Sequence, residues 1–284
     1  MSRPDAATAT IEVVNDWING IDTVLCDLDG VIWLAHEPIE GSRDAIATLR
    51  ESGRRVLFVT NNSAATLAEH EAALARIGIS ASGDVVSSAM AVTQLIQPGQ
   101  RVLIAAGPGV VEAVEHAGGE AVVNDGRPTD AEFDAVVVGL HRDFDYDRLA
   151  VAAGAARACG RLIGTNADST YPTPKGLQPG GGSILAAIAS ASGVEPVIAG
   201  KPNEPMAALV ASMLARPSEA FRPDRVLMVG DRPETDGLFA ARLGSRFALV
   251  RSGVTAPGVQ IVAMTPVDLD VADVFAVARR LVDA

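Results

Sequence analysis

Cysteine, histidine and aromatic residues are scarce in this sequence. Its 284 residues include two cysteines and four histidines, and only 4% are aromatic. Two cysteines make no disulfide framework in a chain of this length, and the spacing of Cys26 and Cys159 fits no metal-binding motif. The histidines form no cluster along the chain. We therefore expect reduced thiols and a cytoplasmic protein that is held together by its hydrophobic core.

Excess positive charge and long apolar runs are also lacking. The chain has 23 Lys and Arg against 35 Asp and Glu, a net charge of −12. Nucleic-acid binders usually carry a basic patch, so we expect no nucleic-acid partner, and an anionic substrate would need local help from a metal or a lysine. No apolar run reaches the roughly 18 residues of a membrane span, and the first twenty residues lack the apolar core of a signal peptide. We expect no membrane partner.

Short apolar runs alternate with segments of helical periodicity along the chain. This alternation is typical of an α/β fold built on a parallel sheet. Thr66 and Glu69 have the spacing of a capping box, which marks the start of one helix. The core strands are expected at 21–26, 54–60, 196–200, 225–230 and 246–250, and the neighbouring helices at 42–52, 66–77, 203–214 and 234–243.

A second α/β unit interrupts this pattern. Residues 101–165 predict the order strand, helix, strand, strand, helix, strand. The simplest organisation is a compact α/β insert between two halves of a larger core. We expect a Rossmann-like parallel-sheet core formed by residues 1–87 and 191–284, and an inserted α/β domain at 88–190.

Polar residues follow directly after four of the predicted core strands. Because the carboxyl ends of parallel strands meet at one edge of a sheet, where ligands bind, we expect these side chains to converge. They are Asp27 and Asp29 after the first strand, Thr60 and Asn61 after the second, then Lys201 and Asp231.

The residue types in this set indicate a metal and a phosphate. Clustered carboxylates repel one another unless a cation joins them, and oxygen ligands without His or Cys suit Mg²⁺. The hydroxyl, the amide and the lysine offer hydrogen-bond donors to a phosphate. Asp27 suits the nucleophile of a phosphoryl transfer through an aspartyl phosphate. Asp29 suits the acid that protonates the leaving oxygen and then activates water.

The four stretches that carry these residues resemble the four ordered motifs of the haloacid dehalogenase (HAD) superfamily. The likeness covers nearly the whole chain from about residue 20, and the insert is similar to the α/β cap domain of the nitrophenylphosphatase-like branch. The resemblance therefore implies a HAD fold with an inserted cap. The motifs are Asp27-Leu28-Asp29-Gly30-Val31, Thr60-Asn61-Asn62-Ser63, Gly200-Lys201-Pro202 and Gly230-Asp231-Arg232-Pro233-Glu234-Thr235-Asp236.

The resemblance implies a role for each acid of the motifs. Asp27 is implied as the nucleophile and a Mg²⁺ ligand, and Asp29 as the acid/base whose backbone carbonyl also binds the metal. Asp231 is implied as the third metal ligand, and Asp236 as an acid just outside the metal's own ligands. One departure is Gly237, because an aliphatic residue commonly stands there in similar proteins.

The remaining motif residues are implied in holding the phosphoryl group. Thr60 and Asn61 would bind it, and Lys201 would neutralise its charge and that of Asp27. The long, polar, glycine-rich segment 165–183 would lie in the part of the cap that selects substrates. The candidate specificity residues are Asp168, Tyr171, Lys175, His36 and His141.

These expectations lead to a Mg²⁺-dependent phosphatase that hydrolyses small phosphomonoesters, such as sugar, glycerol or nucleotide phosphates and the artificial p-nitrophenyl phosphate, through an aspartyl phosphate. A phosphomutase on the same fold stays an alternative. So does a non-catalytic phosphometabolite sensor, although a sensor needs neither a nucleophile nor a neighbouring acid. A nicotinamide-dependent dehydrogenase also uses a doubly wound sheet, but the acidic turn after the first strand would repel its phosphates. In similar proteins the cap often mediates a homodimer, and we leave the oligomeric state open.

Overall fold

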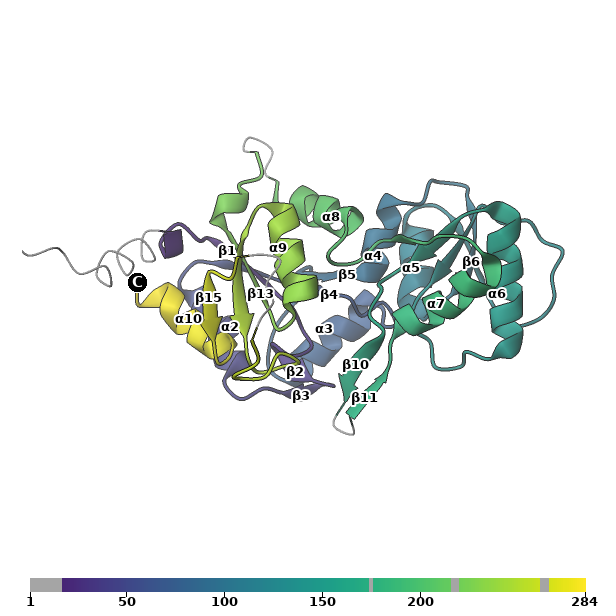
Figure 1. Ribbon diagram of the computed structural model, residues 1–284. Helices are drawn as coiled ribbons and strands as arrows, with labels where there is room; N and C mark the ends of the chain where they lie inside the picture. The colour runs from purple at the N-terminus through teal and green to yellow at the C-terminus, as the bar shows by residue number, and fades with distance from the viewer. Residues whose placement is uncertain (1–16, 174–175, 216–219, 261–265) are drawn as a thin grey trace, which may run out of the picture. The chain divides into compact units, whose positions relative to one another are not determined.

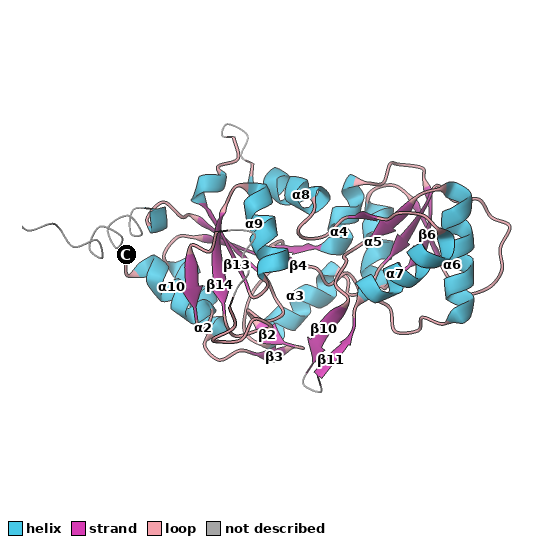
Figure 2. Ribbon diagram, viewed as in Figure 1, coloured by secondary structure: helices cyan, strands magenta, loops and turns pink. Residues whose placement is uncertain are grey.

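The computed structural model describes residues 17–173, 176–215, 220–260 and 266–284. Contacts divide the chain into two compact units. The first unit holds the described residues up to Phe58, Ile77–Ile79 and those from Ala220 on; the second holds Val59–Arg76 and the described residues of Ser80–Glu219. Figures 1 and 2 show a parallel sheet with helices packed on it in each unit.

The first sheet has six strands in the order β15-β14-β13-β1-β4-β5. Its central strands β1 and β13 are buried along their whole length, as expected for a parallel sheet covered on both faces. Cys26 at the end of β1 pairs with Val229 on one side and with Phe58 on the other. The strands are β1 (Thr23–Cys26), β4 (Arg55–Thr60), β5 (Val85–Ser87), β13 (Val226–Gly230), β14 (Arg246–Val250) and β15 (Leu269–Val271).

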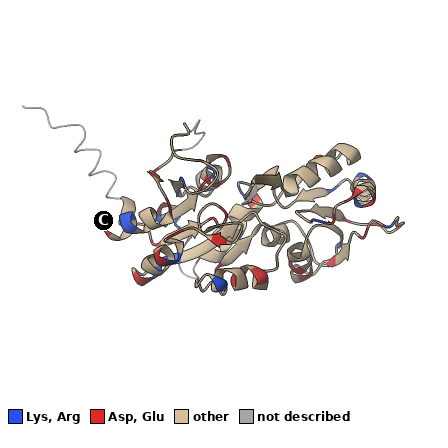
Figure 3. Ribbon diagram, turned by 90° about the horizontal axis from the view of Figure 1, so that it is seen from below, with Lys and Arg blue, Asp and Glu red and all other residues tan. Residues whose placement is uncertain are grey.

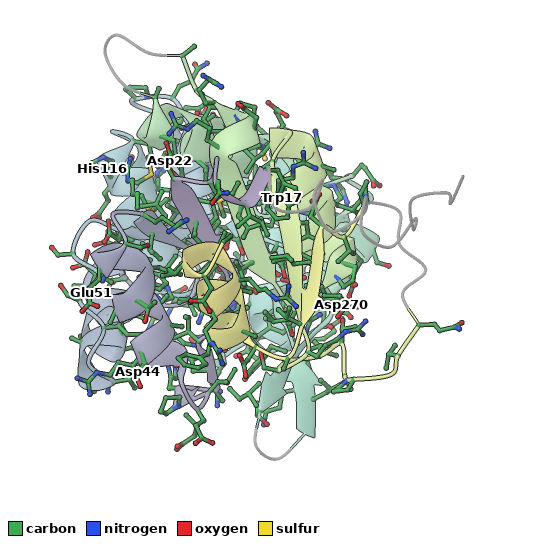
Figure 4. The ribbon with its side chains drawn as sticks, turned by 90° about the vertical axis from the view of Figure 1, so that its left-hand side faces the viewer. Trp17, Asp22, Asp44, Glu51, His116 and Asp270 are labelled. Carbon is green, nitrogen blue, oxygen red and sulfur yellow. The ribbon has the colours of Figure 1, made fainter. Side chains whose placement is uncertain are left out.

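Helices α2 (Ser42–Glu51) and α10 (Val274–Val282) pack side by side in the first unit (Figure 4). The side chain of Asp273 caps α10 by accepting a hydrogen bond from the backbone N–H of Ala276 at 2.8 Å. Asp270 of β15, labelled in Figure 4, accepts two hydrogen bonds from the Arg251 guanidinium. This pair lowers the pKa of Asp270, mainly through the side-chain hydrogen bond.

Five further short elements are described in the first unit. A hairpin of β2 (Trp33–Leu34) and β3 (Glu37–Pro38) follows the end of β1. After β13, the chain forms a π-helical turn, η3 (Pro233–Gly237), and continues into α9 (Leu238–Leu243). The 3₁₀ turn η2 (Pro223–Arg225) leads into β13.

The second sheet has five parallel strands in the order β12-β9-β8-β6-β7. The order of β6 to β9 along the chain, with a helix after β6 and after β8, agrees with the pattern expected for residues 101–165. The strands are β6 (Arg101–Ala105), β7 (Glu120–Val123), β8 (Ala135–Val138), β9 (Leu162–Gly164) and β12 (Val197–Ile198).

One strand expected in the first sheet lies in the second. The segment 196–200, predicted as a core strand, forms β12 and pairs in parallel with β9, Val197 opposite Ile163. That expectation was wrong because a short apolar run indicates a buried strand without indicating which strand it pairs with. The expected domain boundaries near 87 and 190 stay predictions. The two compact units described above are defined by their internal contacts and divide the chain at other positions.

Helices cover the second sheet and fill its core. Leu103 and Val136 of the sheet pack with Ala152 of α6 and Ile184 of α7 in one buried cluster. The capping box of α3 is confirmed, because the Glu69 carboxylate accepts from the backbone N–H of Thr66 at 2.8 Å. Of the helices of the second unit, α5, α6 and α7 contact strands of the second sheet, whereas α3 and α4 contact β5. The helices are α3 (Leu67–Arg76), α4 (Ser88–Ala91) with the 3₁₀ turn η1 (Val92–Gln94), α5 (Pro108–His116), α6 (Tyr146–Cys159), α7 (Gly181–Ser192) and α8 (Glu204–Leu214).

The segment 165–183 is more regular than the sequence indicates. It contains an antiparallel hairpin, β10 (Thr170–Thr173) and β11 (Gly176–Pro179), and its end begins α7. In Figure 3, Lys and Arg residues are scattered among acidic ones and form no continuous stripe along the described part of the chain. Among the described residues, no helix is both long and apolar enough to cross a membrane.

Candidate active site

Three buried carboxylates gather in the first unit. Asp27 follows β1, Asp231 follows the adjacent strand β13, and Asp236 lies in the η3 turn. Their exposed fractions are 9%, 1% and 0%, and one oxygen of each lies within 4.8 Å of the others. We call these three residues the acidic cluster.

Backbone N–H groups hold each carboxylate of the acidic cluster. Asp27 Oδ1 accepts from the N–H of Leu28 at 2.8 Å. Asp231 Oδ2 accepts from Val254 at 2.6 Å, and Asp236 Oδ2 accepts from Arg232 at 3.2 Å. These bonds fix the position of each carboxylate.

Glycines make room for the acidic cluster. A Cβ atom on Gly30 or on Gly253 would overlap the Asp231 carboxylate, and one on Gly230 would overlap that of Asp236. The φ angle of Gly30 is +89°, a conformation that side-chain-bearing residues rarely adopt. The close approach of these carboxylates to the backbone is therefore possible only because glycine stands at these three positions.

The acidic cluster fits a magnesium ion. Two unit charges 4.8 Å apart repel by about 3 kcal/mol at an effective dielectric constant near 20. Burial adds to this cost, because it removes the water that would otherwise solvate each charge. A divalent cation removes that repulsion. The donors are all carboxylate oxygens, the ligand type that Mg²⁺ prefers over the nitrogen and sulfur that zinc takes.

Asp29 lies beside the acidic cluster in the sequence, but it differs in environment. It is half-buried and bridges to Trp33, while Gly30 donates its N–H to the carbonyl of Trp33 at 2.8 Å. The ring of Trp33 contacts that of His36 at a centroid distance of 4.9 Å. His36 is exposed and has a φ of +71°, as the turn of the β2–β3 hairpin requires.

The second polar group consists of Thr60, the last residue of β4, and the loop that follows it; we call residues 60–65 the 60–65 loop. Thr60 is 2% exposed, and its Oγ1 accepts from the N–H of Asn62 at 3.0 Å. Asn61 Oδ1 accepts from the N–H of Lys201 at 2.8 Å, and Asn61 Nδ2 donates to the Lys201 carbonyl at 3.1 Å and to Asp168 Oδ2 at 3.0 Å. The second unit therefore brings two predicted phosphate ligands together, and it adds Asp168.

The carboxyl ends of four strands of the second sheet contact the 60–65 loop. After β6, Gly107 lies so close that a Cβ atom there would be 2.5 Å from the Ala64 carbonyl oxygen. After β8, a Cβ on Gly139 would be 2.7 Å from Ser63 Oγ, and after β12, one on Gly200 would be 2.6 Å from Asn61 Oδ1. After β9, Thr165 Oγ1 hydrogen-bonds Ser63 Oγ at 2.8 Å. The loop thus occupies the edge at which parallel sheets usually bind ligands.

Lys201 is 2% exposed. A buried ammonium group is stable only where anionic or other accepting groups compensate its charge. Two further residues, which the sequence analysis did not select, support the same group. Ser88 Oγ and Asn166 Nδ2 both donate to the Asn61 carbonyl at 2.7 Å. Asn166 carries the signal used for the others, a polar residue just after a strand.

Two other specificity candidates, Tyr171 and His141, belong to the second unit. Tyr171 of β10 donates its hydroxyl to Gln178 at 2.9 Å and accepts from Arg142 at 2.8 Å. His141 Nδ1 donates to the Gly139 carbonyl at 3.1 Å. With Arg142, His141 lines a cavity of about 460 Å³ at the carboxyl ends of β6 and β8. Lys175 lies outside the described residues.

Comparison with known proteins identifies the family. A model of haloacid dehalogenase-like hydrolases matches residues 24–120, and a related HAD-hydrolase-like model matches residues 198–276. These two segments contain all the motif residues from Asp27 to Asp236. The chain belongs to the haloacid dehalogenase-like hydrolases, as the resemblance implied, and the expected α/β fold with a parallel-sheet core is confirmed.

Among individual proteins, the chain is similar to several phosphatases. It is 37% identical over 238 residues to D-glycerol 3-phosphate phosphatase of Mycobacterium tuberculosis, covering 82% of this chain and 64% of that protein. The structure of a glycerol phosphate phosphatase of that organism, in complex with magnesium, matches with a TM-score of 0.74 and 35% identity over 84% of this chain and 70% of that one. A 4-nitrophenylphosphatase of Thermotoga maritima matches with a TM-score of 0.81 and 27% identity over 93% and 98%.

Proposed function

We propose that this protein is a Mg²⁺-dependent phosphatase that hydrolyses small phosphomonoesters. The observation that carries the proposal is the acidic cluster, three buried carboxylates with oxygen donors only, in a chain of the HAD-like hydrolase family. Similarity to a glycerol phosphate phosphatase and a nitrophenylphosphatase supports the substrate class. Sugar, glycerol and nucleotide phosphates are the natural candidates within that class.

The proposed reaction begins at Asp27. One of its carboxylate oxygens attacks the phosphorus, and the bond to the leaving alkoxide oxygen breaks as Asp29 donates a proton to that oxygen. Asp29 then takes a proton from a water molecule, which attacks the aspartyl phosphate and releases inorganic phosphate and free Asp27. Bound Mg²⁺ would supply charge neutralisation that lets an anionic nucleophile approach an anionic phosphate.

Other residues of the chain would bind and orient the phosphoryl group. Asp27, Asp231 and the backbone carbonyl of Asp29 are the proposed metal ligands, with Asp236 supporting them. We propose that Thr60 and Lys201 bind the phosphate of the same ester, and that Asn61, which the sequence also predicts there, contributes through its bonds to Lys201. The support for this step is that the two matched family segments together contain the residues of both units.

The test is phosphate release from a panel of phosphomonoesters, with Mg²⁺ and with EDTA, by wild type and Asp27→Asn. The proposal predicts release that needs Mg²⁺ and vanishes in the variant. Absence of release by wild type from every member would overturn the hydrolase assignment. Rearranged phosphate esters without free phosphate would instead identify a mutase, and tight phosphoester binding without turnover would identify a sensor.

We make three further predictions about where and how this activity works. They are a cytoplasmic location, a homodimer formed through the cap, and the choice of substrate by one or more of the candidates Asp168, Tyr171, Lys175, His36 and His141. Cell fractionation, sedimentation and substrate ranking in single variants test them in turn.

A further inference from the structure

The side chain of Asn61 uses its hydrogen-bonding groups on the protein itself. Its Oδ1 accepts from the backbone N–H of Lys201, and its Nδ2 donates to the backbone carbonyl of Lys201 and to Asp168 Oδ2. An asparagine amide has two N–H donors, so both are engaged. The side-chain amide therefore has no N–H left for a phosphate oxygen.

The orientation of this amide is unambiguous. If its oxygen and nitrogen were exchanged, the nitrogen would face the N–H of Lys201, and the oxygen would face a carbonyl and a carboxylate. Only one orientation pairs each donor with an acceptor. The amide thus forms a two-point pair with the peptide groups of Lys201, and Asp168 keeps it in that plane.

The backbone of Asn61 is anchored as firmly as its side chain. Its carbonyl accepts from Ser88 Oγ and Asn166 Nδ2, both at 2.7 Å. Gly200, next to Lys201, donates its N–H to the Thr165 carbonyl at 2.8 Å, and it has no space for a Cβ atom. The Asn61 amide is therefore a fixed point from which the position of Lys201 is set.

We propose that Asn61 is a positioning residue that holds the Lys201 backbone, and that Asp168 supports Asn61 and does not select substrates. The inference rests on the proposed function, in which the Lys201 ammonium neutralises phosphate charge. A lysine side chain has four rotatable carbon bonds, so its charged end is placed well only if its backbone is fixed. Errors of about 1 Å in such placement cost up to about 100-fold in rate.

A double-mutant cycle separates positioning from direct contact. Wild type, Asn61→Ala, Lys201→Ala and the double variant are compared in kcat and KM. If Asn61 acts through Lys201, Asn61→Ala lowers kcat/KM by about tenfold or more, and the double variant is no worse than Lys201→Ala within about threefold. Effects that multiply in the double variant would overturn the inference, because they would show that Asn61 stabilises the phosphate independently.

Asn124 provides a matched control in the same unit. It is 5% exposed, donates its Nδ2 to the Arg148 carbonyl at 2.8 Å and accepts from the Gly126 N–H at 3.1 Å. Asn124→Ala therefore removes similar side-chain-to-backbone bonds without touching the 60–65 loop. We expect it to lower the melting temperature as Asn61→Ala does while leaving kcat and KM unchanged.

Asp168 keeps the inference testable if Asn61→Ala does not fold. Asp168→Ala removes one of the three bonds to the Asn61 amide, whereas Asp168→Asn retains an oxygen that accepts from Asn61 Nδ2. We expect kcat/KM to fall about threefold to tenfold in Asp168→Ala and to recover in Asp168→Asn for every substrate. A ranking of substrates that changes in these variants would return Asp168 to a specificity role.

Hydrogen exchange gives a readout that does not depend on catalysis. The backbone N–H of Lys201 bonds to Asn61 Oδ1, so its exchange should accelerate in Asn61→Ala and stay slow in Asn124→Ala. Unchanged protection in Asn61→Ala would overturn the positioning role. If wild type releases no phosphate but the exchange result holds, the proposed function fails while the structural link between Asn61 and Lys201 stands.

Discussion

The acidic cluster and the 60–65 loop are two polar groups built on opposite principles. The acidic cluster brings like charges together, and its hydrogen bonds come from backbone N–H groups of neighbouring turns. The loop around Asn61 pairs donors with acceptors through side chains that are far apart in the sequence. The first arrangement is incomplete without a cation. The second is already satisfied by the protein, so it suits the fixed placement of one charged side chain.

The largest expected effect tests whether the acidic cluster supplies the nucleophile. Asp27→Asn keeps the size of the side chain but removes its nucleophilic carboxylate, so turnover should fall by about a thousandfold or more. Phosphate release under saturating Mg²⁺ measures it, with circular dichroism to check the fold. Activity within about tenfold of wild type in pure protein would show that the acidic cluster does not supply the nucleophile.

The next largest effect tests whether the acidic cluster is strained without metal. Asp231→Asn removes one of three buried carboxylates that repel one another. The free energy of unfolding in EDTA should therefore not fall, and we expect it to rise by about 1 kcal/mol. Stabilisation by Mg²⁺, about 2.7 kcal/mol at 100 times the dissociation constant, should disappear. Melting curves with Mg²⁺ and with EDTA measure both. A lower melting temperature in EDTA together with a retained Mg²⁺ shift would show that Asp231 is structural.

Two glycine variants compare the groups directly. Gly230→Ala forces the Asp236 carboxylate to move, whereas Gly200→Ala forces the Asn61 amide to move. We expect Gly230→Ala to weaken Mg²⁺ affinity and Gly200→Ala to weaken phosphate affinity at unchanged Mg²⁺ affinity, each by about tenfold to 100-fold. Titration calorimetry with Mg²⁺ and with inorganic phosphate measures these affinities.

Gly154 in α6 is the control for these substitutions. A Cβ atom there meets nothing within 4 Å, so Gly154→Ala should stabilise the helix by about 0.5–1 kcal/mol without changing either affinity. If Gly230→Ala and Gly200→Ala changed the same affinity, the acidic cluster and the 60–65 loop would not bind different ligands.

The smallest effect concerns the capping box of α3, which follows the 60–65 loop. Hydrogen bonds from Thr66, first of all from its backbone N–H, lower the pKa of Glu69. A carboxyl whose pKa is lower in the folded state stabilises the fold above its unfolded pKa, near 4.3, and loses that stabilisation as the pH falls through the folded value. Glu69→Gln should therefore flatten the dependence of unfolding free energy on pH below about 5, as denaturant titrations measure. An altered kcat at pH 7 would instead show that the 60–65 loop depends on this helix cap.

Local chemistry made several features predictable. The apolar runs that became β1, β4, β13 and β14 were expected, as were the polar residues at their ends and the capping box at Thr66. The HAD-like family, inferred from four short motifs, is confirmed by the matched segments. These features depend on residues close together in the chain, where period, propensity and turn chemistry act directly. The roles given to individual site residues stay predictions.

Features that depend on distant pairing were not predictable. The two-residue strand β12 was expected in the first sheet, yet it pairs with β9 in the second. The sequence predicted Asn61 as a phosphate ligand and did not indicate that its amide contacts Asp168 and Lys201, which are 107 and 140 residues away in the chain. The supporting bonds from Ser88 and Asn166 to Asn61 were not expected at all. No local pattern encodes which of several polar strand ends will face one another.

The α/β class of the fold and the polar residues at the strand ends could be derived from the chain, because periodicity and strand ends are local features. The roles of those residues in a magnesium phosphatase came from the resemblance of four short motifs to a known family. The tertiary structure was needed to show that one oxygen of Asp236 lies within 4.8 Å of those of Asp27 and Asp231, and that the 60–65 loop lies on the carboxyl edge of the second sheet. Both arrangements require close approach of backbone at glycines such as Gly230 and Gly200. A glycine in the sequence permits such an approach, but only packing determines which segment makes it.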